Sequence, residues 1–215
     1  MSLWAIIPVK PLKNAKSRLA AALLPEERYQ LAQAMFRHVL SVALQSPSVT
    51  GALVISRDTK ALAIGRELGA KTLQESAESN LNPALLRATV VLQAWRADAV
   101  LVLPADLPFI NDADIAQLVS LSRDRSIVIA TDSEQDGTNA LLLRPPGAIA
   151  YAFGAGSYAR HIEDAARGGI AVHRYESPRT RLDIDVPADL RMYRRIIAEG
   201  GHSHLPALAP LQDKN

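Results

Sequence analysis

AVLVLPADLP, at residues 99–108, decides the fold: five apolar residues run into Pro104, and a single acidic side chain, Asp106, follows. An uninterrupted apolar run of this length is typical of a strand covered on both faces in a parallel sheet. Two prolines stop the ladder there, because proline has no backbone N–H to donate. Ligands of open α/β sheets bind at the carboxyl ends of strands. Asp106 is therefore a candidate to hold a metal ion or a ligand hydroxyl, with an ordinary Asx turn before Leu107 and Pro108 as the alternative.

Strand and helix patterns alternate on both sides of this stretch. Short apolar runs predict strands at residues 3–9, 53–56, 71–73, 99–103, 127–130, 140–143 and 171–175. Helical spacing and capping signals predict helices at residues 25–46, 59–68, 82–95, 112–122, 158–167 and 187–199. Repeated β-then-α units of this length predict an α/β protein, a three-layer α/β/α sandwich with a mostly parallel central sheet and right-handed crossovers.

Length and composition exclude several classes of protein. The 215 residues suit one domain over residues 1–200, and residues 201–215 are expected to form a flexible C-terminal tail. A formal charge of +2 is too small for a domain that coats nucleic acid, and the absence of cysteine excludes disulfides and thiolate zinc sites. Because no apolar run approaches the roughly 18 residues of a membrane span, we expect a cytoplasmic protein without a membrane partner. The oligomeric state stays open, although an unpaired sheet edge or an exposed helix stripe could serve a homodimer.

Four cations follow the first predicted strand. Lys10, Lys13, Lys16 and Arg18 lie together, and no acidic residue precedes Glu26. Lys and Arg neutralise and orient phosphoryl oxygens, so this loop is a candidate phosphate cradle. A solvated basic loop is the alternative.

A pair of carboxylates lies late in the chain. Asp183 and Asp185 alternate about Ile184, so in an extended segment both carboxylates point to one side while Ile184 points to the core. Carboxylates this close repel unless a cation lies between them, and their oxygens suit Mg²⁺ or Mn²⁺. The alternative is that Asp185 caps the helix that begins at Pro187.

The segment GAGSYA, at residues 154–159, matches the glycine pattern of dinucleotide-binding folds, with Glu176 near the position of a ribose-binding acid. Too little chain follows for the rest of a mononucleotide-binding half. We therefore prefer a helix N-terminus at which backbone amides and Ser157 surround an anionic group. The sequence contains neither a Walker P-loop nor a G-x-S-x-G nucleophile elbow.

Together, a cationic loop, an Asp after a central strand, an Asp pair and a glycine-serine helix start suit nucleotidyl transfer. A pyrophosphate leaving group needs Lys and Arg, the α-phosphate needs a divalent metal, and an ionised phosphate acceptor needs no general base. Positioning and charge neutralisation then supply most of the rate enhancement.

In these features the chain resembles the small guanylyltransferases of deazaflavin coenzyme (coenzyme F-420) biosynthesis. The resemblance implies a GT-A-like, nucleotide-diphospho-sugar transferase-like fold. The resemblance runs from about Ile6 to Leu190. The matching residues are Pro8-Val9-Lys10, Lys16-Ser17-Arg18-Leu19, Leu81-Asn82 with Ala84-Leu85, Pro104 to Pro108, Gly137-Thr138-Asn139-Ala140-Leu141, Phe153-Gly154 with Gly156-Ser157 and His161, and Asp183-Ile184-Asp185 with Pro187.

The resemblance implies that GMP is transferred from GTP to a small phosphorylated acid: 2-phospho-L-lactate, phosphoenolpyruvate or 3-phospho-D-glycerate. It implies Mg²⁺ at Asp106, Asp183 and Asp185, with Mn²⁺ as a substitute. It also implies acceptor contacts at Thr138, Gly154 and Ser157, and GTP phosphates near Lys10, Lys16 and Arg18, with the base toward Asn82. Catalysis would then rest on Lys10, Lys16, Arg18 and Asp106.

Two residues depart from the family pattern. Asp136 stands where the family usually has a second glycine, and Ala155 stands where it usually has proline. Because an inward Asp136 would repel an anionic acceptor, we expect its side chain to face solvent. Another nucleotidyltransferase of this fold, acting on a molybdopterin or a sugar acid, is an alternative function, and an inactive nucleotide-binding module is a second one.

Overall fold

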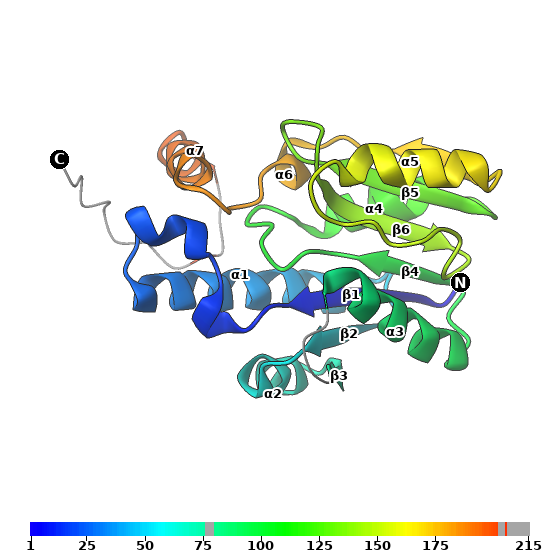
Figure 1. Cartoon of the computed structure of the whole chain (residues 1–215), viewed down its shortest axis with the longest axis horizontal. Helices are drawn as coiled ribbons and strands as arrows, with labels where there is room; N and C mark the ends of the chain where they lie inside the picture. Colours follow the sequence, from blue (N-terminus) through cyan, green and yellow to red (C-terminus); the bar gives the residue numbers. More distant parts are fainter. Residues whose placement is uncertain (76–79, 202–204, 206–215) are drawn as a thin grey trace.

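The computed structural model describes residues 1–75, 80–201 and 205, and a single seven-stranded sheet forms its centre (Figure 1). The strand order is β3-β2-β1-β4-β6-β5-β7. The strands are β1 (Leu3–Val9), β2 (Gly51–Ser56), β3 (Lys71–Gln74), β4 (Ala99–Val102), β5 (Ser126–Thr131), β6 (Thr138–Arg144) and β7 (Ala171–Arg174). Most of the tail predicted over residues 201–215 lies outside the described residues.

Helices cover both faces of the sheet. They are α1 (Pro25–Gln45), α2 (Thr59–Glu67), α3 (Leu81–Ala94), α4 (Asp112–Leu121), α5 (Ser157–Arg167), α6 (Pro178–Arg181) and α7 (Pro187–Ala198), with short 3₁₀ turns η1 (Leu12–Asn14) and η2 (Ser17–Ala21) after β1. Helices α1, α2 and α4 share one buried apolar cluster with the sheet, and α3 and α5 share the other. This arrangement confirms the predicted three-layer sandwich.

Alternation of side chains along the strands explains the two clusters. In β1, Leu3, Ala5 and Ile7 pack toward α1, while Ile6 between them packs toward α3. Successive strand residues point to opposite faces, so a strand that is apolar throughout feeds both layers. A third cluster joins η2 and α1 to Ile184 and α7. It anchors the end of the described chain beside the carboxyl edge of the sheet.

The predicted strands and helices are confirmed, with boundaries that shift by at most two residues. Two features were not predicted. Strand β6 pairs antiparallel with both β4 and β5, and the short helix α6 lies between β7 and the Asp pair. Neither has a periodic signal, since strand direction is decided by tertiary pairing and α6 spans only four residues.

The topology gathers several loops at one edge. Because β1, β2, β3 and β4 are parallel, their carboxyl ends meet there, and antiparallel β6 begins at the same edge with Thr138. The predicted cationic loop and Asp106 therefore lie on neighbouring strands. None of the helices in the described part of the chain has the length and apolar character that crossing a membrane requires.

Candidate functional site

A cleft of about 460 Å³ runs along this carboxyl edge of the sheet. Ligand pockets for molecules the size of a nucleotide commonly have volumes of several hundred Å³. Its lining includes Lys10 and Lys16 from the loop after β1, Asp106 after β4, Asp185 before α7, and Phe153. The structure thus brings two of the four cations of the predicted phosphate cradle and two of the three predicted metal ligands into one cavity.

Lys16 and Asp106 form the closest charge contact in the cleft. The Nζ atom of Lys16 lies 2.6 Å from Oδ2 of Asp106, and the Lys16 side chain is only 8% exposed. The same ammonium lies 3.8 Å from Oδ1 of Asp185. For Lys16 the solvated-loop alternative is therefore wrong. It holds for Arg18 only in part, because the Arg18 side chain is 72% exposed but lies 2.9 Å from Oδ2 of Asp185.

The Asp183–Asp185 segment is fixed against the Asp106 loop through its backbone. The N–H of Ile184 donates to the backbone oxygen of Asp106 at 3.2 Å, and the Ile184 side chain is fully buried. Helix α7 is capped by Asp189, whose Oδ2 accepts the N–H groups of Asp185 and Val186. The alternative that Asp185 serves as the cap is therefore wrong. Its side chain is left to face the cations of the cleft.

Asp183 is the carboxylate with the most perturbed titration. Burial, with repulsion from Asp106 as the second cause, raises the pKa of Asp183 to about 6. A hydrogen bond from Nδ2 of Asn139 at 3.2 Å and the charge of Lys16 oppose this rise. Asn139 also donates to the backbone oxygen of Thr180, so it fixes the segment that carries Asp183.

The carboxylates of Asp106, Asp183 and Asp185 are the predicted Mg²⁺ ligands. Among the described residues, no group of three acidic, cysteine or histidine side chains is arranged to hold a metal ion. Instead, Lys16 and Arg18 compensate Asp106 and Asp185. The donor chemistry nevertheless fits, because Asp106 and Asp185 line one cleft and Asp183 lies close enough to Asp106 for repulsion between them to add to burial in raising the pKa of Asp183. Oxygen ligands of this kind suit Mg²⁺ or Mn²⁺.

Two predicted acceptor ligands, Thr138 and Ser157, lie in a buried hydrogen-bond network with His161. Oγ of Ser157 donates to Oγ1 of Thr138 at 3.0 Å, and Nδ1 of His161 lies 3.1 Å from that same Oγ1. Nε2 of His161 accepts the N–H of Ala152 at 3.0 Å, so Nδ1 carries the proton and donates to Thr138. Burial, followed by the charge of Arg160, lowers the pKa of His161 to about 4 and keeps the ring neutral. Thr138 accepts both bonds, so its own proton remains to be donated.

The N-terminus of α5 differs from the predicted anion site. The N–H of Gly156 donates to Oδ2 of Asp136 at 2.9 Å, that of Ser157 to the oxygen of Gly154, and that of Tyr158 to the backbone oxygen of Asp136. All three amides are thus satisfied within the chain. Asp136 is exposed, as expected, but its carboxylate holds the glycine turn rather than pointing freely into solvent. Gly154 is exposed at the start of this turn, where its φ of +122° favours glycine.

The side chain of Asn82, predicted near the nucleotide base, is engaged by backbone. Its Nδ2 donates to the oxygen of Phe153 at 3.2 Å, and its Oδ1 accepts the N–H of Phe153 at 2.8 Å. Phe153 lines the cleft, so Asn82 shapes it through this neighbour. Lys10 is exposed and lines the cleft.

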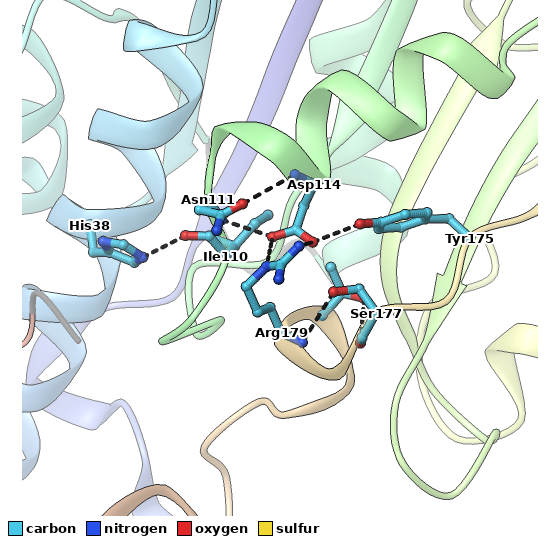
Figure 2. A network of polar contacts seen from close by, with 8 residues as sticks. His38, Ile110, Asn111, Asp114, Tyr175, Ser177 and Arg179 are labelled. Carbon is cyan, nitrogen blue, oxygen red and sulfur yellow. Dashed lines mark hydrogen bonds and ion pairs between the residues drawn. The ribbon is translucent and has the colours of Figure 1, made fainter. Parts of the chain in front are cut away.

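A buried carboxylate outside the cleft, Asp114, joins the two loops that carry the acidic residues (Figure 2). It is fully buried on α4 and accepts hydrogen bonds from Nε and Nη2 of Arg179 on α6, at 2.8 and 2.9 Å, and from the hydroxyl of Tyr175 at 2.7 Å. Burial would raise its pKa, but the bonds from Arg179 and Tyr175 outweigh burial and lower it. Since α4 follows the Asp106 loop and α6 precedes Asp183, this pair fixes one loop against the other.

Sequence reasoning gave no role to Asn139, His161, Asp114 or Arg179. Asn139 could have been noticed as an amide that begins an otherwise apolar strand. Asp114 forms a capping box with Asn111 at the start of α4. Its partner Arg179 lies 65 residues away, and no local pattern links the two.

Comparisons with known proteins agree with this architecture. The family model described as "Guanylyl transferase CofC like" matches residues 3–204. The phosphoenolpyruvate guanylyltransferase of Rubrobacter xylanophilus is 41% identical over 210 residues, which cover 97% of this chain and all of that protein. The 2-phospho-L-lactate guanylyltransferase of Methanothermobacter thermautotrophicus is 37% identical over 204 residues, 95% of this chain and 88% of that one.

Among solved structures, a provisionally assigned nucleotide-diphospho-sugar transferase from Desulfovibrio desulfuricans superposes with a TM-score of 0.68 at 14% identity. The match covers 94% of this chain and 100% of the other. At this identity the likeness concerns the fold, and it confirms the predicted nucleotide-diphospho-sugar transferase-like architecture.

Proposed function

This chain belongs to the CofC-like guanylyl transferase family, and from that premise we propose that it transfers GMP from GTP to the phosphate of a small phosphorylated acid in the assembly of coenzyme F-420. The observation that carries the proposal is the convergence of Lys10, Lys16, Asp106 and Asp185 on one cleft. An inactive binding module would have little need to keep acidic residues there at the cost of mutual repulsion. A molybdopterin or sugar-acid transferase gains no support from the relatives.

In the proposed reaction, a phosphate oxygen of the acceptor attacks the α-phosphorus of GTP, and the bond to the β-phosphate breaks, so that pyrophosphate leaves. In this proposal Lys10, Lys16 and Arg18 neutralise the leaving pyrophosphate: Lys10 and Lys16 line the cleft, and Arg18 forms an ion pair with the cleft residue Asp185. The acceptor phosphate is already ionised, so the site needs no general base. Electrostatic preorganisation of this kind is usually the largest single contribution to enzymatic rate enhancement.

We propose that Asp106, Asp183 and Asp185 hold Mg²⁺, for which Mn²⁺ can substitute. The ion would supply charge neutralisation at the α-phosphate. What the chain supplies is the preorganised acid set: Ile184 N–H fixes the two loops together, and Asn139 orients Asp183. Lys16 would leave Asp106 and move to the phosphates.

We propose phosphoenolpyruvate as the acceptor to test first, because the Rubrobacter relative is named for it. 2-Phospho-L-lactate follows, on the basis of the Methanothermobacter relative. Thr138, Gly154 and Ser157 stay the predicted acceptor contacts. Thr138 can donate its hydroxyl proton to an anionic group, whereas the amides of the glycine turn become donors only if Asp136 releases Gly156.

The test is pyrophosphate release from GTP and Mg²⁺ with phosphoenolpyruvate, 2-phospho-L-lactate or 3-phospho-D-glycerate, each compared with a reaction without acceptor. We expect acceptor-dependent release, and we expect Asp106→Asn to lose several decades of turnover while its unfolding transition is retained. GTP binding without release for any acceptor would favour the inactive module. Near-normal release by Asp106→Asn would mean that Asp106 is structural. The cytoplasmic location and the homodimer stay predictions.

A further inference from the structure

Glu75 lines the cleft beside edge strand β3, three strands away from β4, the strand that Asp106 follows. It follows β3 directly, and its backbone N–H donates to the oxygen of Ser56 at 3.0 Å, which fixes it beside the end of β2. Its side chain lines the cleft and is 11% exposed. Within the described residues its carboxylate has one ion-pair partner, Nε of Arg57 at 3.8 Å, which is too long for a hydrogen bond. The carboxylate oxygens therefore remain able to accept bonds from a ligand.

The sheet order sets the distance between Glu75 and the cations. Strand β3 lies two strands from β1, and neighbouring strands are about 4.8 Å apart, so the end of β3 lies about 10 Å from the end of β1. If Lys10 and Lys16 hold the phosphates, the nucleoside extends along the edge toward β2 and β3. The cleft lining also includes Pro8 and Leu81, whose apolar surfaces suit a base.

Charge decides which part of the substrates can meet Glu75. An ionised carboxylate only accepts hydrogen bonds, and it repels both phosphates and an acidic acceptor. Guanine carries two adjacent donors on its Watson–Crick edge, N1–H and the N2 amino group, and two carboxylate oxygens match them in a bidentate contact. Adenine presents an unprotonated ring nitrogen at the corresponding position, which the same carboxylate would repel.

We infer that Glu75 selects guanine in this cleft by accepting hydrogen bonds from N1–H and the N2 amino group. Arg57 is the positioning residue that keeps the carboxylate at the cleft wall. The inference rests on the proposed function, since it requires that the nucleotide occupies this cleft with its phosphates at Lys10 and Lys16.

The experiment measures equilibrium binding by calorimetry, with Mg²⁺ and without acceptor, for GDP, inosine diphosphate, ADP and 2′-deoxy-GDP. Inosine lacks only the N2 amino group. The unchanged protein should bind GDP about 10-fold more tightly than inosine diphosphate, and about 100-fold more tightly than ADP. Glu75→Ala should weaken the binding of GDP about 10- to 100-fold and leave the dissociation constants of GDP and inosine diphosphate within about 2-fold of each other. Glu75→Gln keeps the side-chain volume and should also reduce the preference for GDP over inosine diphosphate.

Glu163→Gln removes one exposed carboxylate from the outer surface of α5 and is the matched control, for which the preference for GDP should persist. An unchanged ratio of GDP to inosine diphosphate in Glu75→Ala would overturn the inference. So would a variant that loses only its preference over 2′-deoxy-GDP, because the carboxylate would then read the ribose. Base-selective binding without transfer to any acceptor would overturn the proposed function alone. A protein that binds none of the four nucleotides would overturn both the inference and the proposed function.

Discussion

At the scale of single residues, the buried position of Asp183 lowers the stability of the folded chain when its carboxylate is ionised. Its pKa of about 6 lies above the ordinary value of 3.8, because burial and Asp106 disfavour the charged form. A group whose pKa is raised by folding contributes stability below its unfolded pKa, and this contribution is lost as the pH rises through the folded value. Above about pH 6, ionised Asp183 therefore destabilises the metal-free protein.

Replacing this carboxylate should stabilise the fold while damaging the site. We expect Asp183→Asn to raise the free energy of unfolding in EDTA by about 1–3 kcal/mol at pH 8, and by much less at pH 4.5. The new amide can still accept the hydrogen bond from Asn139. Urea titrations at both pH values measure the difference, with Asp112→Asn as a control on the exposed first turn of α4. Equal effects at the two pH values would contradict the raised pKa.

The pKa of His161 is shifted downward by folding, so its contribution to stability changes with pH in the opposite direction. Its pKa of about 4 lies below the ordinary value of 6.5, so its contribution to stability is present above pH 6.5 and is lost as the pH falls toward 4. Protonation would place a charge in a buried ring whose Nε2 already accepts the N–H of Ala152. The loss amounts to at most about 3 kcal/mol over that interval.

A neutral side chain at this position should flatten the acid dependence. We expect His161→Gln to cost about 1–2 kcal/mol at pH 7.5, through lost packing against Phe153, but to lose less stability than the unchanged protein between pH 6.5 and 4.5. His173→Gln, on edge strand β7, is the comparison variant. Urea midpoints across this pH range measure the slope, and an unchanged slope in His161→Gln would assign the acid sensitivity to other groups.

At the scale of elements, the clamp between α4 and α6 should matter more than its single ion pair suggests. Arg179 is 42% exposed, whereas Asp114 is fully buried, so the two partners differ in what their loss leaves behind. Removing Arg179 leaves a buried carboxylate without a cation, with Tyr175, Asn111 and Ser177 as hydrogen-bonding neighbours. Breaking a buried pair by deleting one partner is strongly destabilising for this reason.

We therefore expect Arg179→Met to lower the free energy of unfolding by about 2–4 kcal/mol and to reduce turnover, because α6 leads directly into the Asp183 segment. The matched control is Arg181→Met on the same helix, whose partner Glu176 is 66% exposed. That pair should be worth less than about 1 kcal/mol. If both variants unfold at the same urea concentration, the buried carboxylate does not depend on Arg179.

The elements also show which contacts a sequence can disclose. Apolar runs and helical spacing predicted every strand and every helix except α6, because burial patterns repeat within each element. They could not predict that β6 runs antiparallel or that Asn139 reaches Asp183, 44 residues away. Lys10, Lys16 and Asp106 could be proposed as site residues from the sequence one by one, since each carries a charge in a loop that follows a predicted strand. Their pairing, such as Lys16 with Asp106, depends on the folded arrangement.

At the scale of the whole molecule, the acidic residues of the cleft already form ion pairs with a cation of the same chain. Lys16 is 8% exposed and lies 2.6 Å from Asp106, so it occupies the place of a cation among the acidic residues. A metal ion that took over both Asp106 and Asp185 would remove the two carboxylates that compensate a nearly buried ammonium, at a substantial desolvation cost. Nucleotide phosphates are the partner that could receive it. Metal and nucleotide should therefore bind with positive coupling rather than independently.

The coupling can be measured by thermal unfolding with Mg²⁺, a non-hydrolysable GTP analogue, or both. A ligand at about 100 times its Kd stabilises by about 2.7 kcal/mol, which is about 5–10 °C for a chain of this size. We expect a shift of that order for both ligands together, about 1 °C or less for Mg²⁺ alone, and reversal by EDTA. Lys16→Met removes the competing cation, so Mg²⁺ alone should now stabilise the variant, while the gain from adding nucleotide shrinks. Additive shifts in the unchanged protein, or a Lys16→Met variant that ignores Mg²⁺, would show that Lys16 does not compete for the carboxylates.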